Sequence, residues 1–348
     1  MIRRIYRFML PILALLLAVS AIGCNNLDPN VPANSAEGDS LPKEPCTTHA
    51  FAVVEKINAR ALAEGSVSYV CDVCGATETQ ILPATNSIKI LAVGNSFSTD
   101  AMQYLWDICK DAGINEVILG NLYIGGCSID THASNLQYNL GAYTYYKNTN
   151  GEWTTKKNVK AYNALIEEEW DYITIQQTSK TCGLPESYSK LGTVLNFLDL
   201  NKTNPNARLI FHMTWAYQQD STHSSFPNYN NDQMTMYQMA VDTVQSAVLT
   251  NWLVNGVIPA GTSIQNIRTS YVGDTVTRDG YHMSHDYGRY TVAMTWYAYL
   301  TGGSPDAVDW VPAEQPQLAD HLTVIRESVE NALKNPYAVT NSQYTAKP

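Results

Sequence analysis

Apolar positions recur along residues 88–333 with two alternating periods. Short apolar runs, which are typical of buried strands, are followed by segments with the three-to-four-residue spacing of amphipathic helices. Strands that alternate with helices form a mainly parallel sheet covered by helices on both faces. We therefore predict a three-layer α/β/α sandwich over residues 87–336, followed by a polar tail at 337–348. The pattern predicts strands at 88–93, 117–124, 172–176, 208–213 and 257–260, helices at 101–112, 159–169, 232–249, 286–300 and 317–333, and an inserted hairpin at 143–155.

The N-terminus has the pattern of an export signal and a tether. Three arginines within the first seven residues precede an apolar run at 8–19, which is shorter than a membrane-spanning helix requires. This pattern predicts a signal peptide over 1–23. The run ends in Ala21-Ile22-Gly23-Cys24, which resembles the bacterial lipobox and implies a lipid on Cys24. A plain secretory signal followed by a chance cysteine is the alternative.

Residues 24–44 are polar and rich in Pro, so we expect a lipid-anchored tether that buries too little apolar surface to fold. Asn25 stands where the signal for inner-membrane retention is typically Asp. We therefore expect display on the outer membrane or the cell surface.

Residues 45–84 predict a small β-hairpin module with paired metal-ligand spacing. Cys46-x-x-His49 and Cys71-x-x-Cys74 form two half-sites of the kind that hold a structural zinc ion. The module also resembles zinc-ribbon-like modules in surface proteins of gut-type bacteria. A disulfide between two of the three cysteines, with His49 incidental, is the alternative in an exported protein. Either role is structural, because a module this small needs a covalent or metal staple.

Composition limits the class of partner. The net charge is −10 and no cluster of Lys and Arg occurs beyond the first residues, so the chain lacks the basic surface that nucleic acid requires. The 22 tyrosines favour surfaces that bind neutral rings such as sugars. The oligomeric state stays open.

A serine, a histidine and an aspartate occupy positions that the predicted fold would bring to one edge of the sheet. Gly94-Asn95-Ser96 directly follows the first strand, where a tight turn projects Ser96 above the carboxyl edge. Asp279 precedes His282 by three residues, so one turn of chain can direct both side chains to a common point. A serine hydroxyl needs a histidine to accept its proton and a carboxylate to orient the imidazole.

These segments resemble the SGNH/GDSL hydrolase superfamily. Gly94-Asn95-Ser96 is similar to its block I, with Asn95 in place of the usual Asp, and Asp279-x-x-His282 matches block V in spacing and chain order. The resemblance implies that Ser96 is the nucleophile, His282 the general base and Asp279 the residue that orients it.

The same resemblance implies an oxyanion hole. The backbone N–H groups of Ser96 and of Gly126, with Gly125 as the alternative to Gly126, correspond to two of its donors. The third donor in the superfamily is an Asn side chain of block III, and here the sequence departs from the pattern, with Gln176-Gln177-Thr178-Ser179. A glutamine amide can donate the same hydrogen bond, so Gln176 or Gln177 is expected to do so.

The resemblance to an uncharacterised SGNH-like family of gut-type bacteria is closer still and covers about residues 88–300. Members look like esterases, but the substrates of the family are not established. We expect an exported serine esterase that removes acetyl or similar acyl groups from glycans and needs no cofactor for catalysis. The segments that carry the resemblance are Ile-Leu-Ala-Val-Gly-Asn-Ser-Phe-Ser, Asn-Leu-Tyr-Ile-Gly-Gly-Cys-Ser, Trp-Asp-Tyr-Ile-Thr-Ile-Gln-Gln, His-Met-Thr-Trp-Ala-Tyr-Gln and Arg-Asp-Gly-Tyr-His-Met-Ser.

Two other functions stay open from the sequence. The chain could be a glycan-binding surface lipoprotein that keeps the fold without turnover. Less favoured is a metal-dependent hydrolase with Asp279, His282 and His285 as ligands of an ion that activates water.

The sequence also predicts roles for several residues outside the proposed catalytic group. Trp215 and Tyr217 are expected to wall the substrate cleft, with core packing as the alternative. Ser98 is expected to be a helix N-cap rather than a second nucleophile. Because export favours disulfides, a Cys127–Cys182 bridge is a hypothesis. Cys109 lies at helical spacing and is expected to be buried.

Overall fold

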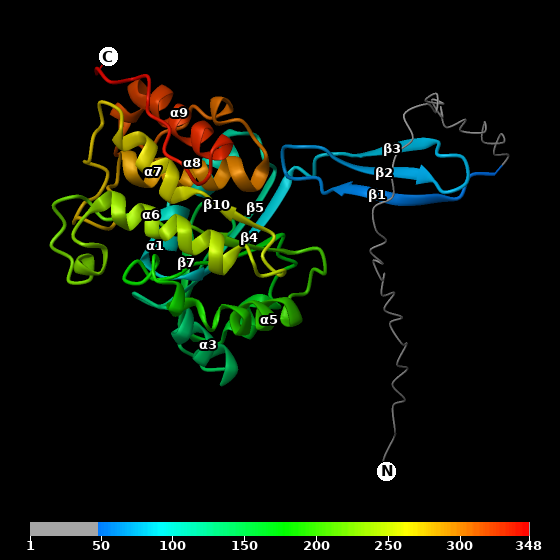
Figure 1. Cartoon of the computed structure of the whole chain (residues 1–348), viewed down its shortest axis with the longest axis horizontal. Helices are drawn as coiled ribbons and strands as arrows, with labels where there is room; N and C mark the ends of the chain where they lie inside the picture. Colours follow the sequence, from blue (N-terminus) through cyan, green and yellow to red (C-terminus); the bar gives the residue numbers. More distant parts are fainter. Residues whose placement is uncertain (1–47, 348) are drawn as a thin grey trace, which may run out of the picture. The chain divides into compact units, whose positions relative to one another are not determined.

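Residues 48–347, which the computed structural model describes, form two separate β-sheets (Figure 1). The smaller is a three-stranded antiparallel sheet with the order β1-β2-β3. The larger has seven strands in the order β10-β9-β8-β4-β5-β6-β7. The predicted α/β/α sandwich with a small N-terminal β-module is confirmed, and the module has three strands.

The strands and helices have the following bounds. The strands are β1 Phe51–Ile57, β2 Gly65–Cys71, β3 Thr77–Leu82, β4 Ser87–Gly94, β5 Glu116–Tyr123, β6 Tyr143–Asn148, β7 Trp153–Val159, β8 Tyr172–Ile175, β9 Arg208–His212 and β10 Gly256–Ile258. The α-helices are α1 Ser96–Met102, α2 Leu105–Asp111, α3 Ile129–Gln137, α4 Ala161–Leu165, α5 Leu191–Asn201, α6 Gln233–Thr243, α7 Ala260–Arg268, α8 Tyr287–Thr301 and α9 Leu322–Lys334. Shorter helical turns are η1 Pro185–Tyr188, η2 Phe226–Tyr229, η3 Val244–Val248, η4 Pro305–Ala307 and η5 Pro316–His321.

Five strands of the large sheet, β10 to β5 in spatial order, run parallel. Strand β4 lies between β8 and β5 and is buried along most of its length, as a central strand covered on both faces must be. The carboxyl ends of β8, β4 and β5 therefore meet at one edge, and the loops that follow them can build a common site. The hairpin β6–β7 adds two antiparallel strands beside β5, as predicted.

Helices form the two outer layers of the sandwich. Helices α1, α2, α7, α8 and α9 pack against one another, and α3, α4 and α5 form the second group (Figure 1). The interior is rich in aromatic side chains, and Trp170, Trp215 and Trp296 are all fully buried. Cys109, in α2, is also fully buried, as expected from its helical spacing.

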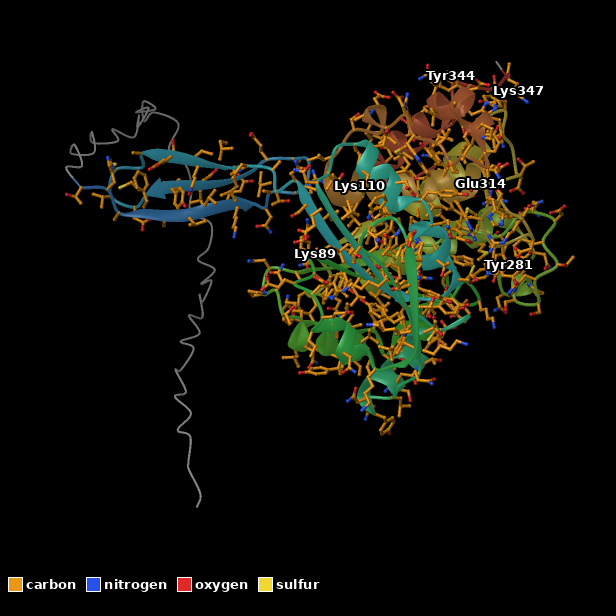
Figure 2. All side chains as sticks on the ribbon, turned by 180° about the vertical axis from the view of Figure 1, so that it is seen from behind. Lys89, Lys110, Tyr281, Glu314, Tyr344 and Lys347 are labelled. Atoms are coloured by element: carbon orange, nitrogen blue, oxygen red, sulfur yellow. The ribbon has the colours of Figure 1, made fainter. Side chains whose placement is uncertain are left out.

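The sequence did not predict α3, α5 and α7, and several of the predicted helices have other bounds in the structure. The segment 159–169 was expected to be one helix, but α4 ends at Leu165. Glu168, beyond that end, is instead held by Lys89 and Lys147, with N–O distances of 3.2 and 2.8 Å (Lys89 is labelled in Figure 2). The helix expected at 101–112 begins at Ser96 and is divided into α1 and α2. Local spacing therefore indicated these helices but not their bounds.

The C-terminal tail is held against the body of the domain. The backbone N–H of Thr340 donates to Asn266 Oδ1 at 2.8 Å, and Tyr344 accepts from the backbone N–H of Tyr271 at 2.8 Å. No helix within residues 48–347 combines the length and the apolar character that a membrane span needs. The predicted signal peptide, the predicted lipidation site Cys24, the predicted tether and Cys46 all lie outside the described residues.

Two buried histidines should make the free energy of unfolding decrease in mildly acidic solution. Burial lowers the pKa of both His132 and His212 to about 3, whereas a histidine in the unfolded chain has a pKa of about 6.5. Between these values the unfolded state binds more protons, so the free energy of unfolding falls with falling pH, by up to about 1.4 kcal/mol per pH unit for each histidine. Urea unfolding at about pH 7.5 and about pH 5 measures this loss. His132→Gln should show a shallower dependence, and an unchanged slope would contradict the assignment.

Candidate active site

Ser96 lies at the first position of α1, directly after the central strand β4. Asn95 caps this helix, because its Oδ1 accepts from the backbone N–H of Phe97 at 3.0 Å. Its Nδ2 donates to the carbonyl of Cys127 at 3.1 Å, which ties the turn to the loop after β5. Gly94 leaves no room for a side chain, since a Cβ there would lie 2.6 Å from Ser98 Oγ. The local sequence thus fixes the direction in which Ser96 projects.

Ser98 is not the N-cap that the sequence suggested. Asn95 takes that role, and the buried hydroxyl of Ser98 donates to the carbonyl of Asn95 at 2.7 Å and to Asn121 Oδ1 at 2.9 Å. The hydroxyl of Ser98 therefore supports the turn from within α1.

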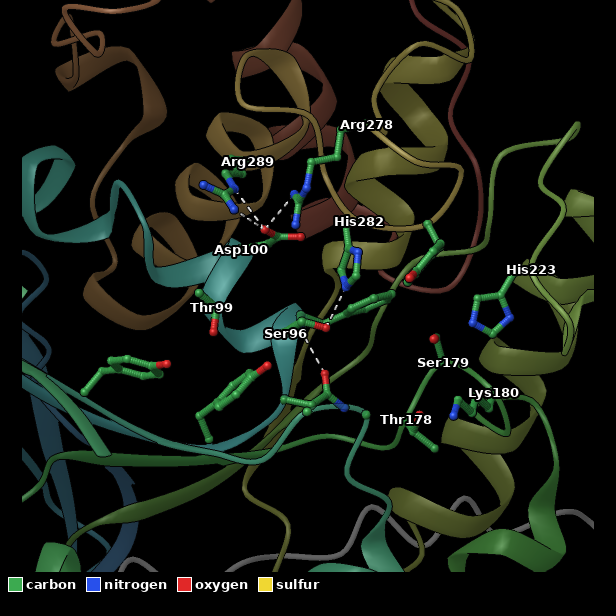
Figure 3. Close-up of a pocket in the computed structure, with 17 residues that line it drawn as sticks. Ser96, Thr99, Asp100, Thr178, Ser179, Lys180, His223, Arg278, His282 and Arg289 are labelled. Atoms are coloured by element: carbon green, nitrogen blue, oxygen red, sulfur yellow. Dashed lines mark hydrogen bonds and ion pairs between the residues drawn. The ribbon is translucent and has the colours of Figure 1, made fainter. Parts of the chain in front are cut away.

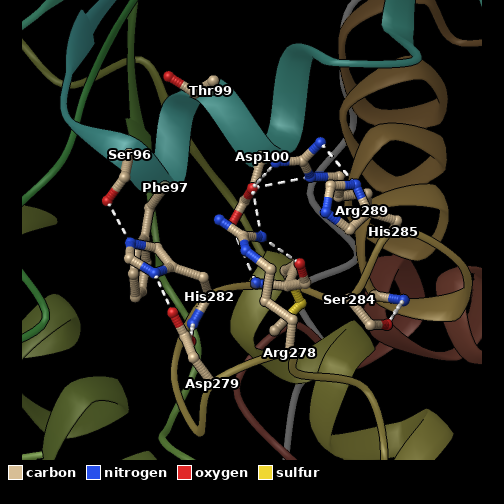
Figure 4. Close-up of polar contacts among 12 residues, drawn as sticks. Ser96, Phe97, Thr99, Asp100, Arg278, Asp279, His282, Ser284, His285 and Arg289 are labelled. Carbon is tan, nitrogen blue, oxygen red and sulfur yellow. Dashed lines mark hydrogen bonds and ion pairs between the residues drawn. The ribbon is translucent and has the colours of Figure 1, made fainter.

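The structure brings Ser96, His282 and Asp279 into one hydrogen-bonded chain (Figure 4). Ser96 Oγ lies 2.8 Å from His282 Nε2, and His282 Nδ1 lies 2.7 Å from Asp279 Oδ2. With a proton on Nδ1 donated to the carboxylate, Nε2 accepts from the serine hydroxyl, which is the tautomer that a general base requires. Gly280 has a φ of +86°, a conformation that allows the tight turn between Asp279 and His282.

The carboxyl group of Asp279 is held in its ionised form. Partial burial alone would raise its pKa, but hydrogen bonds from the imidazole and the backbone N–H of His282, together with a smaller one from the N–H of Tyr281, outweigh it. The pKa of Asp279 consequently lies below its ordinary value. An ionised carboxylate at this place stabilises the imidazolium that forms when His282 accepts a proton.

Asp100, which the sequence reasoning missed, holds the loop between α7 and α8 against α1. This loop carries Asp279 and His282. Its Oδ1 accepts from Arg278 at 3.1 Å and from Arg289 at 2.8 Å, and its Oδ2 accepts from the backbone N–H of Met283 at 2.9 Å (Figure 4). The Asp100 side chain is fully buried. We refer to Asp100, Arg278, Arg289 and Met283 as the Asp100 clasp. A charged residue on the buried side of a short helix is the signal that could have identified it.

Trp215 and Tyr217 do not wall the cleft, which corrects the expectation from the sequence. Both are fully buried. The Trp215 ring stacks on Phe97 at 4.2 Å between centroids, and its Nε1–H donates to the carbonyl of Tyr281 at 2.7 Å. The Tyr217 hydroxyl lies 3.0 Å from Ser179 Oγ. These two residues pack in the core beneath the pocket and contact the segments that carry Ser96 and His282.

Ser96 and His282 open into a pocket with a volume of about 610 Å³ (Figure 3). Its walls come from the loops that follow β4, β5 and β8 and from the loop between α7 and α8. Three tyrosines, Tyr123, Tyr146 and Tyr281, line it alongside polar and cationic groups that include Thr99, Thr178, Ser179, Lys180, His223, Arg278 and Arg289.

Two backbone donors at the pocket are available to an anion. Gly125 and Gly126 line it, and Gly126 has a φ of +61°. Within residues 48–347, the N–H groups of Ser96 and Gly126 donate to no protein acceptor. Preorganised N–H groups of this kind stabilise the negative oxygen of a tetrahedral intermediate.

Neither glutamine takes the place of the block III asparagine, so that prediction is wrong. Gln176 Nε2 donates to Asn95 Oδ1 at 2.8 Å, and its Oε1 lies 3.2 Å from His212 Nδ1. Gln177 Nε2 donates to the carbonyl of Ser187 at 2.8 Å. Both side chains are buried and neither lines the pocket. Thr178, Ser179 and Lys180, which follow them, reach it instead.

The hypothesised Cys127–Cys182 disulfide is absent, and both residues are thiols. Cys127 Sγ lies 3.6 Å from the carbonyl of Ser128, and Cys182 Sγ lies 3.6 Å from the hydroxyl of Tyr229. Burial raises the pKa of Cys127 to about 12 and that of Cys182 to about 11, so neither is a nucleophile at neutral pH. The fact that both cysteines follow strands at the same edge of the sheet was not enough to predict a disulfide between them.

The alternative metal site at Asp279, His282 and His285 does not form. His285 Nδ1 lies 3.2 Å from Arg289, whereas His282 is engaged by Ser96 and Asp279. Within the described part of the chain, the group of His, Cys and acidic residues with metal-binding geometry is His49, Cys71 and Cys74, in the small module.

Comparisons with known proteins agree with this architecture. A model for a domain of unknown function, DUF4886, matches residues 89–314. The crystal structure of a DUF4886 family protein from Bacteroides uniformis ATCC 8492 has 39% identity and a TM-score of 0.70, covering 73% of this chain and 98% of that one.

Two other solved structures are more distant. A candidate SGNH hydrolase from Slackia heliotrinireducens has 16% identity and a TM-score of 0.42, covering 62% of this chain and 100% of that one. TesA has 12% identity and a TM-score of 0.40, covering 61% and 98%. Comparison with curated proteins gives no match.

Substitution of Asp100 by Asn should strongly destabilise the domain. The change leaves Arg278 and Arg289 without their shared carboxylate, and breaking a buried ion pair lowers the free energy of unfolding by on the order of 3 kcal/mol. Urea unfolding of Asp100→Asn measures the loss. The control Asp320→Asn removes an exposed carboxylate and should change the value by less than about 0.5 kcal/mol. Equal effects of the two substitutions would contradict the role of the clasp.

Proposed function

The chain belongs to the DUF4886 family, and we propose that it is a serine esterase of the SGNH type that removes acyl groups from carbohydrates. One observation carries this proposal: a serine, a histidine and an aspartate form a hydrogen-bonded chain at the end of the central strand, with distances of 2.8 and 2.7 Å. The arrangement opens into a pocket large enough for a sugar residue.

The geometry supports a two-step acyl transfer. Ser96 Oγ attacks the acyl carbon while His282 Nε2 accepts its proton, and the imidazolium is stabilised by Asp279. The oxygen of the tetrahedral intermediate accepts from the N–H groups of Ser96 and Gly126. His282 then gives the proton to the departing alcohol, which leaves an acyl group on Ser96. A water molecule, deprotonated by His282, hydrolyses this ester and restores the serine.

The walls of the pocket favour a carbohydrate as the alcohol. Tyr123, Tyr146 and Tyr281 offer aromatic faces for sugar rings, and the hydroxyls of Thr99, Thr178 and Ser179 can pair with sugar hydroxyls. The hydroxyl and cationic side chains in the lining support a short acyl group, such as acetyl, over a fatty acyl chain. Export and anchoring by a lipid on Cys24, which the sequence predicts, would place the enzyme where polysaccharides are available.

Ser96→Ala should abolish acetate release from acetylated polysaccharides. Loss of the nucleophile lowers kcat of serine hydrolases by about 10⁴-fold or more. Acetate is measured enzymatically after incubation with a panel of acetylated glycans. The control is Ser134→Ala, an exposed serine of α3 outside the pocket, which should keep nearly all of the activity.

A fluorophosphonate probe provides a second measurement. It should add one phosphonyl group to wild-type protein, at Ser96, and none to Ser96→Ala. A wild-type protein that binds acetylated glycans without acetate release, and that the probe does not modify, would instead be a glycan-binding protein of this fold.

A further inference from the structure

We propose that the small module binds a structural zinc ion through His49, Cys71 and Cys74. The candidate ligand atoms of these three residues all lie within 4.8 Å of one another. Cys74 Sγ lies 3.3 Å from His49 Nδ1. Zinc bound tetrahedrally to sulfur and nitrogen at about 2.0–2.3 Å keeps its ligands roughly 3.5–3.8 Å apart, so binding requires only small movements.

The backbone explains why residues distant in the sequence meet here. Cys71 ends β2 and begins a tight turn, in which its carbonyl accepts from the N–H of Gly75 at 2.8 Å. The N–H of Asp72 donates to the carbonyl of Ala50 at 3.0 Å, which places His49 beside the turn. The turn therefore presents Cys71 and Cys74 toward the start of β1, as metal-binding turns do.

The module needs a staple because its sheet buries little apolar surface. Val53, Val54 and Ile81 are 59%, 61% and 57% exposed. A three-stranded sheet without a covered apolar face has little independent stability. A structural zinc ion supplies folding free energy directly, since its site is not formed in the unfolded chain.

Sulfur and nitrogen ligands favour zinc over magnesium or calcium, which prefer oxygen. No disulfide joins cysteines within residues 48–347. The sequence pattern offers Cys46, three residues before His49 and outside the described residues, as a fourth candidate ligand.

Metal analysis of the full chain tests the site. Protein purified without chelators should contain one zinc ion per chain by plasma mass spectrometry, and Cys74→Ser and His49→Gln should each lose most of it. Cys109→Ala, which removes a cysteine from the main domain, should retain the zinc. Backbone hydrogen exchange in β1–β3 should accelerate after chelation.

Two results would overturn the proposal. The first is metal-free wild-type protein in which intact-mass measurement shows a disulfide among Cys46, Cys71 and Cys74. The second is zinc content unchanged in both ligand variants. Near-UV circular dichroism separates these results from general unfolding, because the main domain contains the buried tryptophans Trp170, Trp215 and Trp296.

A second inference, which rests on the proposed function, concerns the charge of the substrate: we infer that Lys180 binds an anionic group on the sugar. Three cations, Lys180, Arg278 and Arg289, line the pocket. The one carboxylate in the lining, Asp100, is engaged by both arginines, and the nearby Asp279 is engaged by His282. The site thus carries excess positive charge in a chain whose net charge is −10.

Lys180 is the cation that is left to bind a ligand. Within residues 48–347, its ammonium group makes no ion pair. It lies close to Gly126, since a Cβ built on that glycine would be 3.9 Å from Nζ. Figure 3 shows Lys180 on the same side of the pocket as His223 and Ser179. A carboxylate or sulfate on a sugar bound over Ser96 would meet this ammonium without displacing a protein anion.

Binding of sugars that contain no ester tests this inference independently of turnover. Methyl glucuronide and glucose 6-sulfate should bind at least about tenfold more tightly than methyl glucoside by calorimetry at low salt, and added salt should reduce the preference. The preference should fall in Lys180→Gln and persist in Lys190→Gln, an exposed control. Absence of a preference in wild type, or its persistence in Lys180→Gln, would refute the role. A preference in a wild-type protein that releases no acetate and that the fluorophosphonate probe does not modify would refute the esterase proposal and leave the role of Lys180 in binding standing.

Discussion

The site depends on one buried carboxylate that joins the two ends of the domain. Ser96 and His282 are 186 residues apart in the chain, and each is carried by a short segment that could not hold its position alone. Asp100 supplies the connection, because it accepts from two arginines and from the N–H of Met283, the neighbour of His282. The stacked pair of Phe97 and Trp215 adds an apolar contact under the same loop. The hydrogen-bonding distance between Ser96 and His282 thus depends on neighbouring polar and aromatic residues that hold their segments in place.

Sequence reasoning located the groups that could react but missed those that hold them. Ser96, Asp279 and His282 were identifiable because each follows a strand end or stands at a short, fixed spacing. The buried roles of Gln176 and Gln177 were not, since each depends on a partner from a distant segment, and for Trp215 the sequence left cleft wall and core packing both open. The glutamines have the right chemistry for an oxyanion hole, yet their amides are used within the core. Residue type and strand position could not distinguish a side chain that points into the pocket from one that points beneath it.

The fold itself was more accessible than the site. Alternating strand and helix periods define the parallel sheet, and these periods come from burial over many residues, so single errors have little effect. Helix ends were less predictable: Glu168, which was expected inside a helix, lies beyond α4 and pairs with Lys89 and Lys147 from distant segments. Strand order, with β4 between β5 and β8, is likewise a property of long-range pairing.

The two edge strands of the large sheet affect the tendency of the protein to associate with itself at high concentration. On one side the sheet ends in β10, which is only three residues long, and on the other in β7, in which Lys156 and Lys157 are both exposed. Unpaired strand margins can recruit strands from other molecules, and brevity and positive charge both oppose this. The hairpin that widens the sheet beside β5 therefore also protects it against self-association in a crowded setting.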